Sequence, residues 1–385
     1  MFKNINGFKK IIGFNKNFTL ASTAIFVATA LSATVSTAQA KGRPTVENIL
    51  PLEHICSPTL KFRAQAMTFE QFVDSCNEVG QEEGYFHARL ETHGLPVDND
   101  LNEDLRMVVF DDYDQYNRYG KRLFNINTNN GGMYIEGDAT DANNQASFYA
   151  HEASWLRPEF SIWNLKHEYV HYLDGRFNLK GNFSDYPTNT VWWSEGMAEY
   201  ISKEDNNADA IALINTAGGN RTLAQVFATT YSNSVEEIYD WGYLGNRFMF
   251  EQQMQTIRDL RQATRNGDWA SYQSQINAAA AANEQQWQAW LVTLAGGNAA
   301  AVAKASKVSS VSKQSVANAK VAVDSTGTID NGKAAKDLAH TAYHLRTQAR
   351  SLKLSLQQAG DKQGLSEQLQ QVNQQINALK QQRNR

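Results

Sequence analysis

The sequence predicts an α+β protein with a small sheet in its N-terminal half and helices in its C-terminal half. Short apolar segments at 105–110 and 131–135 indicate strands, the first ended by acidic residues and the second opened by glycines. Segments around 165–177 and 190–203 carry apolar and aromatic residues typical of helices. Residues 338–379 repeat a 4-3-4-3 apolar spacing in two runs, which predicts a helical hairpin or coiled coil.

Composition and length suit one sizeable globular domain plus an extension, with 42% hydrophobic and 20% charged residues among 385. We expect a domain over 41–290, a low-complexity linker over 291–334 and the helical tail over 335–385. Residues 300–385 hold 13 Lys and Arg against 5 Asp and Glu, although the whole chain carries a net charge of −4. A basic tail on an acidic domain predicts docking, self-association, a partner or an anionic surface. It has no nucleic-acid-binding motif, so we exclude a DNA-binding module.

The first forty residues have the pattern of a Sec-type signal peptide. A lysine-rich segment precedes an apolar, alanine-rich run from Leu20 to Val35, and Ala38-Gln39-Ala40 provides an A-x-A cleavage site. The alternative is an uncleaved membrane anchor, for which the run is short. We therefore expect an exported, secreted protein that begins near Lys41, passes through the periplasm and keeps no stable membrane span.

The only two cysteines, Cys56 and Cys76, lie near the expected mature N-terminus. In an oxidising compartment such a pair favours a disulfide over two free thiols. From Pro58 to His93 the apolar spacing predicts helix, and Thr68 with Gln71 resembles a capping box at a helix start.

Gly131 and Gly132 open the predicted strand at 131–135. Glycines at the start of an edge strand permit close backbone approach, and an unpaired edge can bind an extended peptide by strand addition. We therefore predict that this strand binds substrate; the alternative is a plain hairpin turn with a glycine pair.

The residues from His167 to His171 form an H-E-x-x-H motif in a predicted helix. Two histidines four residues apart lie on one face of a helix, so their imidazoles can share a metal ion. Glu168 would lie beside the remaining metal position as a general base for an activated water. The alternative is a helix with two unrelated surface histidines.

A second aromatic helix places Glu195 and Glu199 one turn apart. Burial of Glu195 beside Trp192 and Trp193 would be costly without a cation or hydrogen-bond donors. We therefore expect Glu195 to be the third metal ligand of a site with one open position. Glu199 is expected to accept the outer N–H of a ligand histidine, unless it lies on a solvated face. His151 is rejected as a ligand because position 155 holds Trp155.

Taken together, these motifs resemble the peptidase domain of the secreted microbial collagenases, which are zinc metallopeptidases of the gluzincin type. The resemblance rests on the runs 167–177 and 192–200, and on 130–136, which is similar to the double-glycine edge strand of that family. It covers roughly residues 43–275.

The resemblance implies a thermolysin-like fold with a small mixed sheet and a helical C-terminal half. It implies that His167, His171 and Glu195 bind Zn2+ and that Glu168 is the catalytic base. Glu136 falls on a position that contributes to a structural Ca2+ site in better-known members.

Residues 231–250 are dense in aromatic side chains, and zinc peptidases need a donor facing the developing oxyanion. The resemblance favours Tyr231 for this role, with Tyr239 and Tyr243 as rivals. All three could instead be core aromatics.

The resemblance implies hydrolysis of peptide bonds in collagen-like chains. Larger members carry an N-terminal activator domain of helical repeats and C-terminal β-sandwich recruitment domains, which are credited with gripping the triple helix. This sequence shows neither pattern, so we expect cleavage of gelatin, unfolded collagen chains or collagen-like peptides. Two alternatives are a catalytically silent collagen- or peptide-binding module and a surface scaffold that acts through its helical tail.

Overall fold

The computed structural model describes residues 43–183, 186–216 and 218–305, the tail positions Leu345 and Ala349, and residues 363–383. The expected signal peptide lies outside the described residues. So do the predicted linker from residue 306 onwards and most of the first predicted tail helix.

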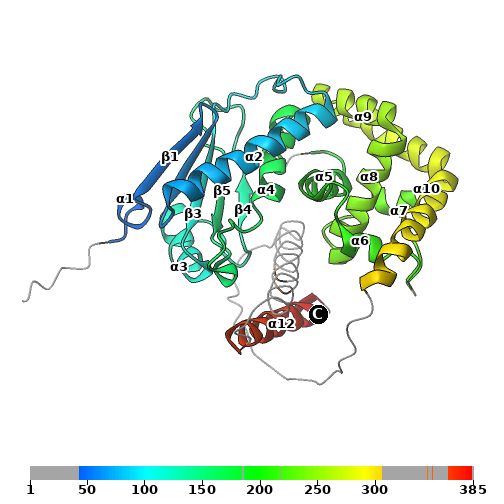
Figure 1. Ribbon diagram of the computed structural model, residues 1–385. Coiled ribbons are helices and arrows are strands. Elements are labelled where there is room, and N and C mark those ends of the chain that lie inside the picture. The colour runs from blue at the N-terminus through cyan, green and yellow to red at the C-terminus, as the bar shows by residue number, and fades with distance from the viewer. Residues whose placement is uncertain are drawn as a thin grey trace, which may run out of the picture. The chain divides into compact units, whose positions relative to one another are not determined.

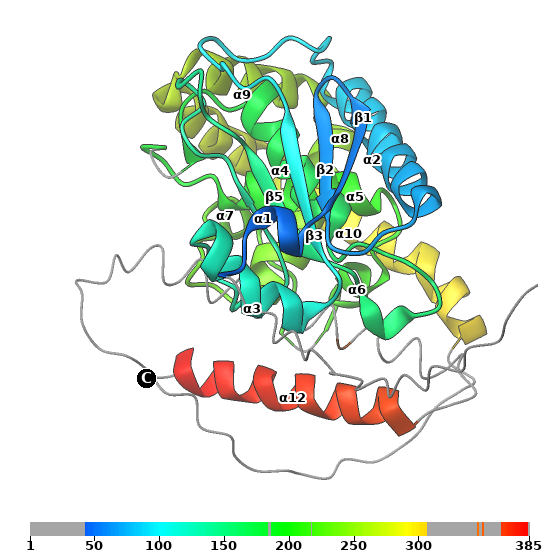
Figure 2. The same cartoon turned by 90° about the vertical axis from the view of Figure 1, so that its left-hand side faces the viewer.

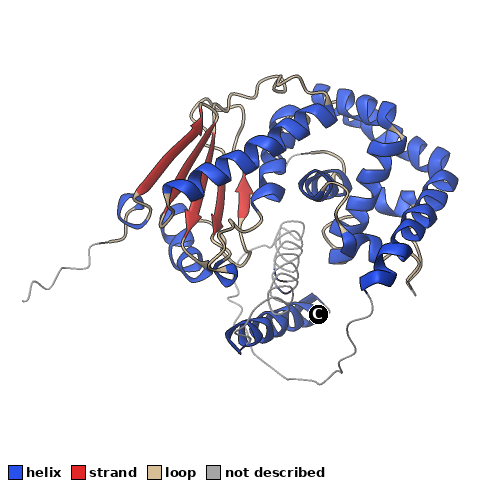
Figure 3. Cartoon of the chain, viewed as in Figure 1, coloured by secondary structure: helices blue, strands red, loops and turns tan. Residues whose placement is uncertain are grey.

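A mixed five-stranded sheet occupies the N-terminal half, in the order β1-β2-β3-β5-β4. Figure 2 labels β1, β2, β3 and β5, and Figure 3 draws the strands in red. Its strands are β1 (Leu52–Ser57), β2 (Leu60–Ala64), β3 (Leu105–Phe110), β4 (Met133–Ile135) and β5 (Ser147–His151). The pairs β2–β3 and β3–β5 are parallel, whereas β1 and β4 are antiparallel edge strands. The α+β prediction is confirmed, as is the strand over 105–110.

The prediction of helix from Pro58 to His93 is wrong over its first part. Strand β2 occupies 60–64, and the helix α2 begins only at Phe69 and runs to Leu90. The predicted capping box is confirmed, because the Thr68 hydroxyl accepts from the Gln71 amide and the Gln71 side chain accepts from the Thr68 amide.

Strand β3 lies at the centre of the sheet and is buried on both faces. Met107 and Val109 face the main core with α2 and the helix α4 (Leu165–Phe177), while Val108 and Phe110 face a second core beside α3 (Tyr113–Phe124). Successive strand residues point to opposite faces, so a nearly continuous apolar run fits this central position.

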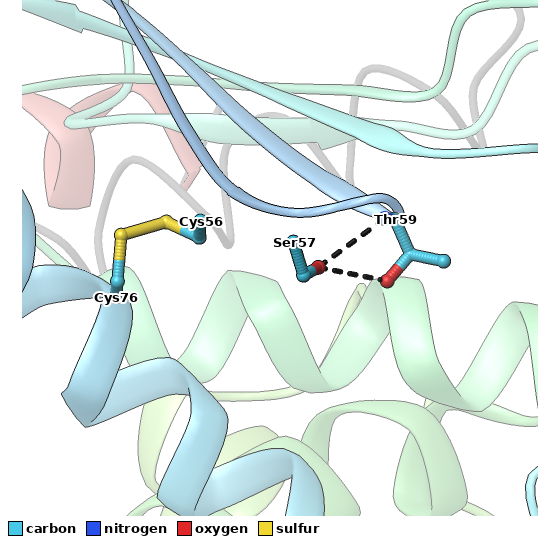
Figure 4. Close-up of a disulfide and its surroundings, with 4 residues drawn as sticks. All are labelled: Cys56, Ser57, Thr59 and Cys76. Carbon is cyan, nitrogen blue, oxygen red and sulfur yellow. Dashed lines mark hydrogen bonds between the residues drawn. A yellow bond between two sulfur atoms is a disulfide. The ribbon is translucent and has the colours of Figure 1, made fainter. Parts of the chain in front are cut away.

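A disulfide joins Cys56 of β1 to Cys76 of α2 (Figure 4). Beside it, the Ser57 hydroxyl accepts from the Thr59 amide in the turn between β1 and β2. The disulfide therefore links edge strand β1 to helix α2, which packs against the sheet.

Helices form most of the remaining described chain (Figure 1). They are α1 (Val46–Ile49), η1 (Ser154–Leu156), α4 (Leu165–Phe177), α5 (Val191–Lys203), α6 (Ala208–Ala212), α7 (Leu223–Phe227), η3 (Glu236–Trp241), α8 (Gly242–Gln252), α9 (Met254–Asn266), α10 (Trp269–Ala305) and α12 (Gln363–Arg383). Helix α10 continues past the expected domain boundary at 290, through the Gly296–Gly297 pair.

Val372 of α12 and Ala349 share an apolar cluster with Trp155 and Trp163. Within the described ranges, every helix is too short or too polar to cross a membrane.

Candidate metal centre

Helix α4 presents His167 and His171 on one face. Their rings lie edge to face, with the two Nε2 atoms 3.2 Å apart. His167 is buried and His171 is mostly buried, because α4 packs between the sheet and α5. At this distance a protonated Nε2 of one ring can donate to the other, and two unprotonated Nε2 atoms can share a cation.

Glu195 of α5 completes a triangle with the two histidines. Its Oε2 lies 3.3 Å from His167 Nε2 and 3.4 Å from His171 Nε2. Tetrahedral zinc with bonds of about 2.0–2.1 Å separates its ligand atoms by roughly 3.3 Å, so these three atoms fit a zinc ion. They form one of the two groups of three potential metal ligands in the described part of the chain. The other comprises His54, Cys56 and Cys76, whose sulfurs are consumed by the disulfide.

Glu199 lies one turn beyond Glu195 and holds the outer side of His167. The His167 Nδ1 is 3.0 Å from Glu199 Oε1, and Lys203 donates to the other carboxylate oxygen. Burial raises the pKa of Glu199, but Lys203 and His167 outweigh it and lower the pKa to about 2. An ionised Glu199 accepts a hydrogen bond from the Nδ1–H, so Nε2 is the nitrogen of His167 that faces the cluster.

The protonation of His167 links metal binding to pH. Burial lowers its pKa, but hydrogen bonds with Glu195 and Glu199 outweigh burial and raise the pKa to about 10. A cation that binds this cluster must therefore displace a proton from His167, so metal affinity should fall as the pH falls.

Glu168 is almost fully buried and is held by two donors. Its Oε2 accepts from the Tyr134 backbone amide at 2.8 Å, and its Oε1 lies 3.2 Å from Asn164 Nδ2. These bonds hold the carboxylate between strand β4 and the start of helix α4. Its position suits a base that acts on a water beside the ligands.

Strand β4 follows Gly131 and Gly132 and lies at the sheet edge, as the sequence predicts for this segment. A Cβ on Gly132 would lie 3.0 Å from the Tyr149 carbonyl oxygen of β5, so the glycine permits this approach. The Tyr134 amide points away from β5 to Glu168, which links the edge strand to the metal centre.

The three tyrosines considered for oxyanion stabilisation differ in position. The Tyr231 hydroxyl donates to Glu195 Oε1 at 2.5 Å, and the Tyr239 ring lies 5.9 Å from the His167 ring. The Tyr243 hydroxyl instead donates to the Glu204 carbonyl at 2.7 Å. The structure thus brings Tyr231 and Tyr239 to the metal centre and directs Tyr243 elsewhere.

Glu136 and His151 lie outside this cluster. A Glu136 oxygen accepts from the Phe183 amide at 2.9 Å, and the other oxygen would be 2.4 Å from a Cβ on Gly175. Among the described residues, Glu136 belongs to no group of three potential metal-binding side chains. His151 Nδ1 lies 2.7 Å from the Glu152 carbonyl oxygen, so the side chain rejected as a ligand has a structural contact.

Three contributors to the site were missed from the sequence: the Tyr134 amide, the Asn164 side chain and Lys203. Lys203 follows Glu199 by four residues, a spacing that permits an ion pair on a helix and could have identified it. Asn164 likewise precedes Glu168 by four residues, at the start of α4, so the same spacing could have identified it. Only the Tyr134 amide depends on how strand and helix meet in space, which carries no local pattern.

Comparison with known proteins agrees with the resemblance. The family model described as collagenase matches residues 21–290. A microbial collagenase of Vibrio alginolyticus is 43% identical over 252 residues, which cover 65% of this chain and 31% of that protein. A microbial collagenase of Vibrio vulnificus is 39% identical over 255 residues, covering 66% and 31%. Collagenase ColT of Clostridium tetani is 26% identical over 208 residues, covering 50% and 20%.

The chain spans about a third of the length of the Vibrio relatives. The matched region contains the whole candidate metal centre, from the β4 edge strand to Tyr239. The resemblance inferred from the motifs is therefore confirmed: this chain belongs to the collagenase peptidase family.

Proposed function

We propose that this protein is a secreted zinc metalloendopeptidase that hydrolyses peptide bonds in gelatin, unfolded collagen chains or collagen-like peptides. The observation that carries the proposal is the triangle of His167, His171 and Glu195 with sides of 3.2–3.4 Å, beside the buried Glu168. Membership of the collagenase family and relatives named microbial collagenase support the substrate class.

His167, His171 and Glu195 would hold the ion. When bound, zinc supplies a Lewis-acidic centre that lowers the pKa of a coordinated water. Glu168 takes a proton from the attacking water and returns it to the leaving amine. The Tyr231 phenol is our choice as donor to the developing oxyanion, and the Gly131–Gly132 strand holds the substrate extended by strand addition.

The proposal also assigns roles to Glu199 and Glu136 and includes the order of the domains. Glu199 orients His167, and Glu136 stays a candidate Ca2+ ligand. The peptidase domain would have a thermolysin-like fold over residues 41–290, preceded by a cleaved signal peptide and followed by a linker and a helical tail. Secretion rests on the signal-peptide pattern of residues 1–40.

Glu168→Gln tests the proposal. The amide keeps the shape of the side chain but removes the base, so we expect gelatin cleavage to fall by roughly 10²–10⁴-fold. Bound zinc should stay at the wild-type level, because residue 168 is not a ligand in this scheme. Gelatin zymography with and without chelator, alongside metal analysis, measures both. Activity in the variant, or a wild-type protein that binds no zinc, would overturn the proposal.

A further inference from the structure

The three candidate ligand atoms come from two helices, so the distance between those helices sets the size of the metal site. His167 and His171 belong to α4, whereas Glu195 belongs to α5. The backbone hydrogen bonds of each helix fix residues within that helix and leave the spacing between helices to side chains. A shift of 1 Å between α4 and α5 would exceed the tolerance of zinc–ligand distances, which is about 0.2 Å.

A buried polar contact outside the metal cluster joins the two helices. The indole N–H of Trp193, two residues before Glu195, lies 3.1 Å from both carboxylate oxygens of Asp174, three residues after His171. Trp193 is 0% exposed and Asp174 is 1% exposed. Since a single N–H is directed between two oxygens, small displacements of either helix lengthen at least one of the two contacts.

Asp174 is also held from its other side. The Asn178 side-chain amide donates to Asp174 Oδ1 at 2.8 Å, and Arg261 of α9 donates to Asn178 Oδ1 at 2.8 Å. Thr264 of α9 donates to the Asn178 carbonyl at 2.7 Å. This chain of hydrogen bonds connects α5, α4 and α9, and satisfied buried networks of this kind fix one relative arrangement of their elements.

Burial of the Asp174 carboxylate costs free energy of desolvation, which an apolar side chain at this position would avoid. Burial raises the pKa of Asp174 to about 6, although Asn178 and Trp193 partly offset the effect. An ionisable group buried among neutral donors loses hydration. Such a group contributes direction and register between helices, which apolar contacts of the same area do not.

We propose that Asp174 and Trp193 are positioning residues of the metal site, which hold Glu195 of α5 at binding distance from the two histidines of α4. The inference rests on the proposed function, because it assumes that zinc binds this cluster. Neither residue touches the ion or the substrate. Their contribution should therefore appear in metal affinity before it appears in the chemistry.

The test is zinc affinity, measured on the full chain by competition with a chromophoric chelator. Trp193→Phe removes the N–H and keeps an aromatic ring, so we expect the zinc Kd to rise about tenfold or more, in the range known for residues that support metal ligands. Trp192→Phe is the matched control. Its indole is also 0% exposed and donates at 3.0 Å, but to Tyr272 of α10, so its Kd should change less than about threefold.

Substitutions of Asp174 supply the second arm. Asp174→Asn keeps an oxygen that can accept from Trp193 and should bind zinc within about threefold of wild type, whereas Asp174→Ala should match Trp193→Phe. Melting of the zinc-free variants separates general damage from loss of position. We expect Trp192→Phe and Trp193→Phe to lower the zinc-free melting temperature similarly while differing in Kd.

Two results would overturn the inference. One is an unchanged zinc Kd in Trp193→Phe, and the other is an equal rise in both tryptophan variants. If either result occurs while the wild-type protein binds zinc tightly, the positioning role is wrong and the proposed function still holds. If wild type binds no zinc, both the proposed function and this inference fail.

Discussion

Beyond the proposed ligands and base, Tyr231 is the residue whose position bears most directly on the proposed chemistry. Its hydroxyl donates to Glu195 Oε1, the oxygen that is not directed at the histidines. The phenol therefore lies beside the candidate ligand atoms, which is the position that the proposed mechanism requires of an oxyanion donor. Burial, together with the negative charge of Glu195, raises the pKa of Tyr231 well above its ordinary value, so the phenol keeps its proton and can donate.

Tyr231→Phe should lower kcat for gelatin peptides by roughly 100-fold and change KM little, because an oxyanion donor acts mainly in the transition state. Steady-state kinetics on a fluorogenic collagen-like peptide measures the split. Tyr243→Phe is the control, since its hydroxyl donates to the Glu204 carbonyl. If Tyr239→Phe loses kcat and Tyr231→Phe does not, the role belongs to Tyr239.

Glu82 of α2 is a buried carboxyl group that makes the stability of the fold depend on pH. It is 3% exposed, and neither carboxylate oxygen has a hydrogen-bond partner among the described residues. Burial raises its pKa to about 8, and Lys166 offsets this only partly. A raised pKa means that the folded state binds the proton more tightly than the unfolded state. The stabilisation from this group is therefore present below about pH 4.5 and is lost as the pH rises through 8.

Glu82→Gln should remove that loss. We expect the variant to melt at the wild-type temperature near pH 5 and about 5 °C above it at pH 8.5, because the amide carries no charge to bury. Thermal unfolding followed by circular dichroism across this range tests the prediction. A variant less stable than wild type at pH 8.5 would show that Glu82 is ionised and favourably placed in the fold.

At the scale of elements, the glycines of α5 and α8 determine how closely these helices cross. A Cβ on Gly196 would lie 2.4 Å from the Gly242 carbonyl oxygen, and a Cβ on Gly242 would lie 3.1 Å from the Gly196 Cα. Asn246 fixes the crossing by donating to the Trp192 carbonyl at 2.7 Å. Gly196, the residue next to Glu195, therefore permits the close packing of α5 against α8 and so helps to determine the position of α5.

Gly196→Ala should destabilise the protein by about 1–3 kcal/mol, because the added methyl meets backbone that cannot move without shifting α8. Gly80→Ala on α2 is the matched control, since a Cβ there has no neighbour within 4 Å. It should be neutral or stabilising by up to about 1 kcal/mol. Denaturant titration of both variants measures the difference. Equal stability of the two would mean that α8 moves freely against α5.

Elements that depend on local pattern were predicted from the sequence, and elements that depend on distant partners were not. The H-E-x-x-H helix and the Thr68 capping box need only residues three and four apart, and the strand over 105–110 is a continuous apolar run. Strands β1 and β2 are short and partly polar, and β2 owes its place to pairing with β3 more than forty residues later. The helical spacing that begins at Phe69 was therefore extended too far towards the N-terminus.

The same distinction applies to the metal centre. Three candidate ligands and a base were identified because two motifs carry them. The Tyr134 amide could not be found in this way, because it reaches Glu168 only when strand β4 packs against α4. The contact between Asp174 and Trp193 likewise exists only once two helices have met.

At the scale of the whole molecule, the described chain divides by burial into a peptidase core and a tail. Leu291 of α10 is fully buried in the core, and the candidate metal centre lies entirely before it in the sequence. Further along the chain, Ala349 and Val372 contact the apolar cluster that contains Trp155 and Trp163, in the segment that leads into α4. The described tail residues Ala349 and Val372 thus pack against aromatic side chains of the core, and neither belongs to the candidate ligand group.

A chain that ends after Gly297 should keep gelatin cleavage within about twofold of the full chain, because every proposed ligand, base and donor precedes the cut. It should lose a little stability, because Trp155 and Trp163 lose their apolar cover and become exposed to water. Gelatin zymography, with Glu168→Gln in the same shortened chain as control, measures cleavage, and thermal melting measures stability. If the shortened protein still binds zinc but no longer cleaves gelatin, the tail is needed for the catalytic reaction. Retained cleavage would argue against a scaffold whose function depends on the tail alone.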